Sequence, residues 1–465
     1  MGAGREQSSR STLKPDSITS MGMSLPSIDQ RPARRLLVPF TRFAELEFSG
    51  SLVLLLATVA ALVLANSRFA AVYERVLELP FGASFGTAAF HWTAQEWVND
   101  GLMAIFFLVV GLEVKRELLL GELASFRRAF LPVMGALGGV ITPAIVYWFR
   151  NGGGPGARGW GIPIATDIAF SLAILTLFSR RVPVGLKIFL VTLAIVDDIA
   201  GVLVIAVAYT SHLRLGFLAL VALIFGVCLA LNRLGVLRLS VYMTAGVALW
   251  WAMHASGIHA TLTGIVLALA IPSRSFVGTG SFLERGRVRL SELGKAVRHS
   301  GPLNQTAREH LHKLRSGIEL VESPLDRLQA GLHPWVSFVI VPLFALTNAG
   351  VSLHGFHLSS VRQPVISGIL LGLVLGKPIG ITVFSWVAVR LRLAELPHGV
   401  SWLQLHAVSW LGGIGFTVSI FIAGLAFGPG ERYTTARIAV LGGSACAAAL
   451  GAAMIALTHS RSEGS

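Results

Sequence analysis

The stretch Leu193-Ala-Ile-Val-Asp-Asp-Ile-Ala-Gly-Val-Leu-Val-Ile205 places two adjacent carboxylates, Asp197 and Asp198, in the middle of an apolar segment that runs from about 185 to 210. An ionised Asp at the centre of a bilayer costs roughly 2.5–3.5 kcal/mol even on the more lenient insertion scale, so two in a row need a positive reason. The rest of the chain therefore has to supply a membrane fold, a counter-charge and a path for water.

The composition supports a membrane fold. Hydrophobic residues make up 54% of the chain and charged residues 13%, about half the charged fraction of a typical soluble domain. The net charge of +14 could indicate nucleic-acid binding, but Lys and Arg lie between apolar runs, so we expect no nucleic-acid partner. The two cysteines, Cys228 and Cys446, lie inside apolar runs and are expected to be small core residues, with no disulfide or cysteine metal site.

Apolar segments recur along the chain at lengths close to the 20 or so residues that a helix needs to cross the hydrocarbon layer. We count twelve and predict an all-α membrane protein with twelve transmembrane helices. The segments are 48–66, 96–118, 129–149, 157–178, 185–210, 215–232, 238–254, 257–272, 334–350, 365–389, 403–427 and 436–458.

The positions of Lys and Arg predict the topology, because cytoplasmic loops are enriched in them. With twelve helices the basic loops fall on one side, so both termini are predicted to be cytoplasmic. The expected regions are a disordered cytoplasmic tail, helices one to eight, a long charged cytoplasmic connection, helices nine to twelve and a cytoplasmic C-terminal tail. Their bounds are 1–42, 43–272, 273–333, 334–458 and 459–465.

Part of the long connection has apolar residues at helical spacing, which predicts an amphipathic helix on the membrane face or against the helix bundle. A solvated insertion without a transport role is the simpler alternative, and we favour it. The residues at this spacing are Leu311, Leu314, Ile318 and Val321.

The fourth and eleventh segments carry signals for a broken helix. Pro163 lies in the fourth, and Gly412, Gly413 and Gly415 lie in the eleventh. Interrupted segments at matching places in two halves of a chain indicate a transporter with inverted-topology repeats, here helices 3–5 and 10–12, and a site near the bilayer midplane. Alternatively, the glycines only allow close helix packing.

Charged residues near these breaks predict the site. Half-helix ends carry partial charges, which Asp167 and Lys377 could offset. Asp197 and Asp198 differ by about 100° around their helix, so one can face a partner while the other faces a cavity. Carboxylates, the Thr166 hydroxyl and freed carbonyls suit a hard monovalent cation, and two carboxylates allow protons and the cation to occupy the site in turn.

Structural roles compete with these interpretations. The Asp pair could be hydrogen-bonded to neighbouring helices, Asp167 could be a helix cap only, and Lys377 could be a purely structural partner. For His259 a packed, hydrogen-bonded role is favoured over proton transfer, and His333 is expected to start the ninth helix at the interface.

Several motifs in order resemble the bacterial NhaA Na+/H+ antiporter family over about 45–458. They are Gly111-Leu-Glu-Val-Lys-Arg-Glu-Leu118, Thr166-Asp-Ile-Ala-Phe170, Leu193-Ala-Ile-Val-Asp-Asp198, Gly257-Ile-His-Ala-Thr-Leu262, His333-Pro-Trp335, Asn348-Ala-Gly-Val-Ser352, Gly376-Lys-Pro378 and Gly413-Ile-Gly-Phe-Thr417.

The resemblance implies twelve helices, inverted repeats, crossing broken helices 4 and 11, and electrogenic exchange of more than one proton per Na+ or Li+. Asp198 matches the principal cation-binding carboxylate, and Asp197 its neighbour that pairs with the lysine matched by Lys377. Thr166 and Asp167 match residues at the helix crossing. The cluster tied to pH activation is matched by Glu113, Arg116 and Glu117, and earlier polar positions of the same helix by Asn99 and Asp100.

The chain departs from the family pattern in two places. The connection before the ninth helix is longer than expected, and Gln329-Ala330 stand where the pattern has a Glu-His pair. The second departure leaves the motifs of the predicted site intact but puts the pH set-point in doubt.

We therefore predict an electrogenic, pH-regulated antiporter of the bacterial inner membrane that exports cytoplasmic Na+ or Li+, bound at Asp197 and Asp198, in exchange for external protons. A sodium-coupled solute symporter on the same fold is the alternative, and a cation channel is a second rival. An intramembrane aspartyl protease is disfavoured because its two acids lie on facing helices, so we expect no enzyme and no cofactor.

Expected partners are Na+, Li+, H+ and the lipid bilayer. A homodimer is one expected assembly, although the sequence does not determine the oligomeric state, the ion preference, the pH profile or the role of either the N-terminal tail or the connection.

Overall fold

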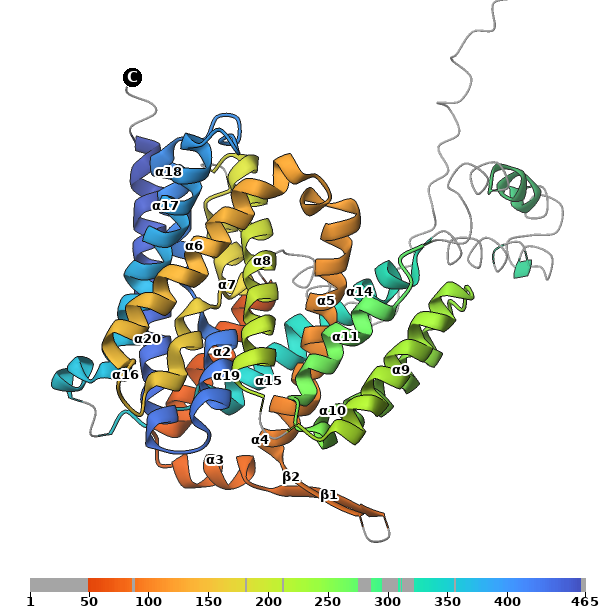
Figure 1. The fold of residues 1–465 in the computed structure, drawn as a ribbon, viewed down its shortest axis with the longest axis horizontal. Helices are drawn as coiled ribbons and strands as arrows, with labels where there is room; N and C mark the ends of the chain where they lie inside the picture. Colours follow the sequence, from red (N-terminus) through yellow and green to blue (C-terminus); the bar gives the residue numbers. More distant parts are fainter. Residues whose placement is uncertain are drawn as a thin grey trace, which may run out of the picture. The chain divides into compact units, whose positions relative to one another are not determined.

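The computed structural model describes residues 49–85, 88–179, 182–210, 213–274, 286–294, 308–309, 311, 322–354 and 357–460, and most of them are helical (Figure 1). The helices of the first half are α2 (Ser49–Ala65), α3 (Ala70–Leu77), α4 (Ala94–Glu96), η1 (Trp97–Leu102), α5 (Met103–Leu120), η2 (Glu122–Ala124), α6 (Phe126–Asn151), η3 (Ala157–Ile164), α7 (Ile168–Leu177), α8 (Val184–Ala208), α9 (Leu215–Arg233), α10 (Leu239–Ser256), η4 (Ala260–Leu262) and α11 (Thr263–Ala270). Those of the second half are α14 (Pro324–Trp335), η5 (Val336–Ile340), α15 (Val341–Asn348), η6 (Leu358–Arg362), α16 (Pro364–Leu371), η7 (Gly372–Gly376), α17 (Lys377–Arg390), α18 (Trp402–Leu411), α19 (Phe416–Phe427) and α20 (Glu431–Ser460).

By length and apolar composition, eight helical stretches of the described residues can cross a membrane. They are Ala94–Leu120, Phe126–Asn151, Ala157–Leu177, Val184–Ala208, Leu215–Arg233, Pro324–Asn348, Pro364–Arg390 and Glu431–Thr458. Two bent pairs, α2 with α3 and α18 with α19, would raise the number to ten. Helices α10 and α11 occupy the seventh and eighth predicted segments without meeting this test. The structure is thus consistent with an all-α membrane protein, while twelve crossings stay a prediction.

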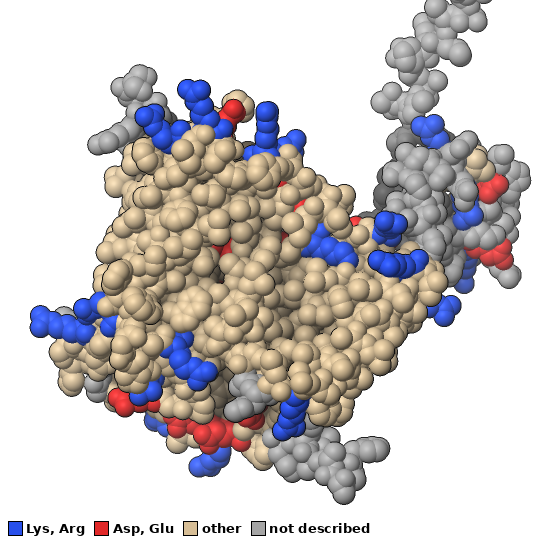
Figure 2. All heavy atoms as spheres, viewed as in Figure 1, with Lys and Arg blue, Asp and Glu red and all other residues tan. Residues whose placement is uncertain are grey.

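The outer surface of the helices is apolar and the charges lie mainly at their ends. On the face shown in Figure 2, Lys, Arg, Asp and Glu gather toward the top and bottom, with a mostly uncharged band between them. Large apolar side chains such as Val207 and Leu223 are 84% and 64% exposed, as expected for side chains that face lipid. Cys228 is buried as predicted, but Cys446 is exposed on α20, so its predicted core position is wrong.

The segment between the first two predicted spans contains structure that hydropathy does not reveal. Helix α3 is followed by an antiparallel hairpin of β1 (Pro80–Phe85) and β2 (Ala88–Thr93), in which Pro80 is opposite Thr93. Thr93 and Glu96 then form a reciprocal capping box, which starts α4 at the end of the hairpin.

The ninth helix begins ten residues before its predicted start at 334, so the expected boundary of the long connection and the expected place of His333 are wrong. Its first residue is Pro324, and the Ser323 hydroxyl caps it by accepting from the Asp326 amide at 3.1 Å. The first turns of α14 are polar, and for this reason a search for apolar segments misses them. The N-terminal tail, the C-terminal tail beyond 460 and most of the expected amphipathic helix at 311–321 lie outside the described residues.

Helices α6 and α17 pack at backbone contact through a pair of glycines. A Cβ added at Gly138 would overlap the carbonyl group of Gly380, and a Cβ at Gly380 would overlap that of Gly138. Small residues allow such close approach between membrane helices, where lipid provides no hydrophobic drive for association. This contact holds α17, which begins with Lys377, against α6.

We expect Gly138→Leu to destabilise the protein by about 1–3 kcal/mol, because the larger side chain has to separate α6 from α17. Thermal unfolding of the detergent-purified protein measures the change. The matched control is Gly226→Leu on α9, where an added Cβ meets no atom within 4 Å. Equal melting temperatures for the two variants would show that the glycine contact is unimportant.

Candidate functional site

The interruptions of the fourth and eleventh segments lie against each other. Residues 165–167 separate η3 from α7, and α18 and α19 are bent by 52° at their break. The Asp167 amide donates to the Ile414 carbonyl at 2.6 Å, and the Thr166 hydroxyl lies 2.8 Å from the Gly412 carbonyl. Each break therefore supplies partners for backbone groups that the other leaves free, as required where no water is present.

Two serine hydroxyls add further hydrogen bonds between the two breaks. Ser171 of α7 donates to the Leu411 carbonyl at 2.8 Å, and Ser419 of α19 donates to the Ile162 carbonyl at 2.7 Å. Both accepting carbonyls belong to the half-helix that ends at the opposite break. The C-terminal ends of the half-helices thus receive direct hydrogen bonds from hydroxyls, including Thr166, while Lys377 reaches them only through the Thr166 hydroxyl.

Asp167 stabilises the N-terminal ends of both second half-helices. Its Oδ1 accepts from the Phe170 amide at 3.2 Å in α7, and its Oδ2 accepts from the Thr417 amide at 3.2 Å and from the Thr417 hydroxyl at 2.6 Å in α19. The residue is 3% exposed. A carboxylate at two helix N-termini offsets both partial positive charges, which is the helix-end role that the sequence offered for Asp167. Its part in cation binding stays a prediction. Thr417 is a partner that the sequence analysis quoted in a motif without assigning it a role.

The glycines of the eleventh segment are needed for space. The φ angles of Gly412 and Gly415 are negative, so no left-handed backbone is involved. A Cβ at Gly413 would overlap the Leu373 carbonyl, and a Cβ at Gly415 the Ser419 hydroxyl. The packing role offered as the alternative thus coexists with the break. Pro163 lies in the 3₁₀ turn η3, just before the break of the fourth segment.

Asp197 and Lys377 form a buried ion pair beside these breaks. Lys377 Nζ donates to Asp197 Oδ2 and to Thr166 Oγ1, and both charged side chains are 0% exposed. The Thr166 hydroxyl has one proton to share between Asp197 Oδ2, at 2.6 Å, and the Gly412 carbonyl. Lys377 follows the π-type turn η7 and is fully buried at the start of α17. The pair is thereby tied directly to the broken helices.

One oxygen of this pair has no partner. Asp197 Oδ1 is buried and accepts no hydrogen bond from the described residues. A buried polar atom in this state is costly, so Oδ1 is an available position for a proton or a cation.

Asp198 lies one residue further along α8 in a different environment. It is 7% exposed, and within the described part of the chain no hydrogen bond or ion pair to it is present. The charges that act on it come from Asp197, Glu113, Asp167 and Lys377. Asp198 is therefore a carboxylate without its own counter-ion, as the helical angle between the two acids predicted.

The residues predicted to respond to pH point to different partners. Glu113 is partly buried and close enough to Asp198 to interact electrostatically. Arg116 lies 3.6 Å from Asp326 of α14, and Glu117 accepts from the Glu122 amide at 2.9 Å. Only Glu113 is thus directed to the acids of the site.

Other residues singled out in the sequence have structural contacts. His259 Nε2 lies 2.9 Å from the Tyr209 carbonyl, which fits the packed role favoured for it. His333 is exposed near the end of α14. Gln329, at the departure from the family pattern, has a buried Oε1 without a partner in the described residues.

A second polar cluster, which the sequence did not predict, surrounds Asn348 at the end of α15. Its side chain donates to Asn99 Oδ1 at 2.7 Å and accepts from Gln95 at 3.2 Å and from the Tyr433 hydroxyl at 3.1 Å. Arg437 donates to the Asn348 carbonyl at 3.1 Å. Asn348 thus joins α15 to α4, η1 and α20.

Within the described ranges, no three His, Cys, Asp or Glu side chains converge on a metal site. Buried acids, a buried lysine and two interrupted membrane helices in mutual contact instead define a membrane transport protein.

The family model for Na+/H+ antiporter 1 matches residues 41–455. The chain is 45% identical over 424 residues to an Na+/H+ antiporter NhaA of Koribacter versatilis, an alignment that covers 91% of this chain and 92% of the relative. It is 44% identical to an NhaA of Oleidesulfovibrio alaskensis, over 90% and 93% of the two chains, and 43% identical to an NhaA 2 of Sorangium cellulosum, over 91% and 90%. The chain belongs to the Na+/H+ antiporter 1 family, which confirms the resemblance seen in its sequence.

We expect Lys377→Met and Asp197→Asn each to lower stability by about 3–5 kcal/mol, because each leaves a buried partner unpaired. The double variant should lose less than the sum of the two changes. Thermal unfolding in detergent gives the ranking of the four proteins.

The control for this cycle is the exposed pair Arg116 and Asp326, whose neutralisation should change stability by at most about 1 kcal/mol. Additive losses for Asp197 and Lys377 would argue against their coupling.

Proposed function

We propose that the chain is a secondary antiporter that moves Na+ or Li+ out of the cytoplasm in exchange for protons from outside. The observation that carries the proposal is the difference between the two acids of α8. Asp197 is neutralised by Lys377, whereas Asp198 has no counter-ion of its own. The names of the relatives, which are Na+/H+ antiporters, agree with it.

Asp198 is the principal cation ligand in this proposal. A desolvated Na+ needs several oxygen ligands, and the neighbourhood offers Asp197 Oδ1, the Thr166 hydroxyl and carbonyls of the breaks. These groups complete the site through small shifts of the broken segments. Asp167 remains bound to both helix ends and contributes negative charge without leaving them.

The exchange follows from competition for the same carboxylates. Protons from outside neutralise Asp198 and Asp197, which displaces the cation and releases Lys377 from its partner. The site then opens to the cytoplasm and the protons leave. A cytoplasmic cation binds the carboxylates that have lost their protons. Because two carboxylates titrate for one monovalent cation, more than one proton moves per cation and the exchange is electrogenic.

Glu113, Arg116 and Glu117 are proposed to set the pH response, with Glu113 acting on Asp198 through its charge. The uncharged Gln329-Ala330 in α14, in place of the family's Glu-His pair, is expected to alter that response.

The membrane arrangement is part of the proposal. We infer twelve crossings, inverted repeats of helices 3–5 and 10–12, both termini in the cytoplasm and a bacterial inner-membrane location. Contact between the breaks of the two halves supports the repeats. A homodimer is also proposed, because within the described residues the β1–β2 sheet has two strands, and an outer strand edge can pair with a second copy.

We expect Asp198→Ala to abolish exchange, because the remaining acid is paired with Lys377. Cation-induced dequenching of a proton gradient in everted vesicles, scanned over pH and over Na+, Li+ and K+, measures it. The control is Glu395→Gln, an exposed acid in the loop between α17 and α18. Retained exchange in correctly folded Asp198→Ala protein would refute the assignment.

A sodium-coupled symporter is separated from an antiporter by reconstitution. With no organic solute present, we expect an imposed proton gradient to drive Na+ through the purified protein in liposomes, in the direction opposite to the protons. Na+ flux that depends on an added solute would favour the symporter, and flux indifferent to the proton gradient would favour a channel.

A further inference from the structure

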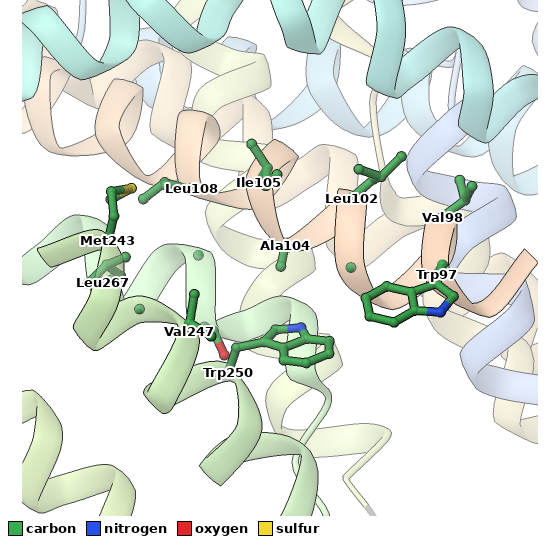
Figure 3. Close-up of a pocket in the computed structure, with 14 residues that line it drawn as sticks. Trp97, Val98, Leu102, Ala104, Ile105, Leu108, Met243, Val247, Trp250 and Leu267 are labelled. Atoms are coloured by element: carbon green, nitrogen blue, oxygen red, sulfur yellow. The ribbon is translucent and has the colours of Figure 1, made fainter. Parts of the chain in front are cut away.

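An apolar pocket of about 660 Å³ lies between the second membrane segment and the pair α10 and α11, away from the ion site (Figure 3). Its volume falls within the range of small-molecule sites. The walls come from η1 and α5 on one side and from α10 and α11 on the other. Apart from Thr263 and the two indole N–H groups, the lining side chains are apolar.

The pocket exists because α11 lies close to α5 while α10 does not. A Cβ at Gly264 would overlap the backbone of Ala104 and Leu108, so α11 contacts α5 directly. Helix α10 packs mainly on α9 and leaves a gap toward α5. The rim residues Trp97 and Val247 are 41% and 69% exposed, so the pocket opens to the outside of the helices.

The two ends of the pocket differ in chemistry. At one end Trp97 and Trp250 stack with ring centroids 6.3 Å apart, and Trp92 packs edge-on against both at 5.2 Å. Met243 and Leu267 line the other end (Figure 3). Because tryptophan gathers at the membrane–water boundary, the pocket runs from that boundary toward the hydrocarbon.

Polar groups lie near the tryptophan end. Trp250 Nε1 donates to the Asp100 carbonyl at 3.1 Å, which places the η1 turn that carries the Asp100 carboxylate beside this end. The Arg214 amide donates to the Ser256 carbonyl at 2.9 Å, so the exposed Arg214 lies at the end of α10, the helix that carries Trp250. Groups of both signs suit a headgroup that carries a phosphate and an ammonium. Thr263, which lines the pocket and is 3% exposed, has a hydroxyl without a partner among the described residues, and it can donate to an ester carbonyl.

We propose that this pocket binds an acyl chain of one zwitterionic phospholipid, with its headgroup at the tryptophan end. The chain fills the apolar gap between α5 and α10, where water would be unfavourable. The lipid thereby joins α10 to the helix that carries Glu113. Na+ exchange does not depend on this proposal, and each can fail without the other.

The test compares lipid retention in the full-length protein and in a variant that blocks the rim. Val247→Trp places a large side chain at an already exposed position, so folding should be unaffected. Leu223→Trp on α9, at 64% exposure, is the matched control. After exhaustive detergent exchange, phosphate assay and mass spectrometry of extracted lipid give the phospholipid content per protein.

We expect wild type and Leu223→Trp to retain one more phospholipid per chain than Val247→Trp. Added phosphatidylethanolamine should raise the melting temperature of the first two proteins and leave that of Val247→Trp unchanged. Equal retention and equal temperature shifts in all three would overturn the proposal.

A second measurement uses the native pocket. Phosphatidylethanolamine with brominated acyl chains should quench tryptophan fluorescence in wild type at amounts too low for bulk lipid contact, and Trp97→Phe with Trp250→Phe should remove that quenching. Undiminished quenching in the double variant would overturn the proposal. So would efficient disulfide cross-linking of Val247→Cys between two chains in which Cys228 and Cys446 are replaced by Ser, because a second copy would then cover the pocket.

Discussion

A bilayer interior offers no water to a free backbone group or an unpaired charge, and the centre of this structure follows from that constraint. Two helices are interrupted at membrane depth, and each interruption is tolerated because the other provides its hydrogen-bond partners. The same contact brings Thr166 and Asp167 beside α8. The residues of the proposed ion site therefore also stabilise the broken helices.

The three acids near this contact are compensated by different partners and to different degrees. Asp167 is stabilised by two helix N-termini, and Asp197 by a lysine with which it is fully buried. Asp198 has only its small exposure and the more distant lysine to offset three nearby carboxylates. A carboxylate whose negative charge is poorly compensated is suited to exchange a proton for Na+, because either cation neutralises that charge.

The periphery is built differently from this centre. Helices α9 and α10 present apolar side chains outward and leave an open pocket against α5, whereas α6 and α17 meet at backbone contact through Gly138 and Gly380. Tight packing around the site and looser packing at the edge suit a protein whose central helices need defined positions. A lipid in the edge pocket would make the membrane itself part of that packing.

The sequence by itself determined the class, the family and the broken segments, because hydropathy, ordered motifs and helix-breaking residues can be read along the chain. From helical rotation it also predicted different roles for Asp197 and Asp198, and these roles stay a proposal. It did not reveal the hairpin β1–β2, whose six-residue strands are too short to appear as membrane segments. It also missed the start of α14 at Pro324, whose first turns are polar. Only the tertiary structure showed that hydroxyls donate directly to the C-terminal ends of the broken helices, that Thr417 binds Asp167, and that Asn348 joins three other elements. These contacts join residues up to about 250 positions apart. A local sequence pattern does not show which distant helices will pack together to satisfy each other's polar groups away from lipid.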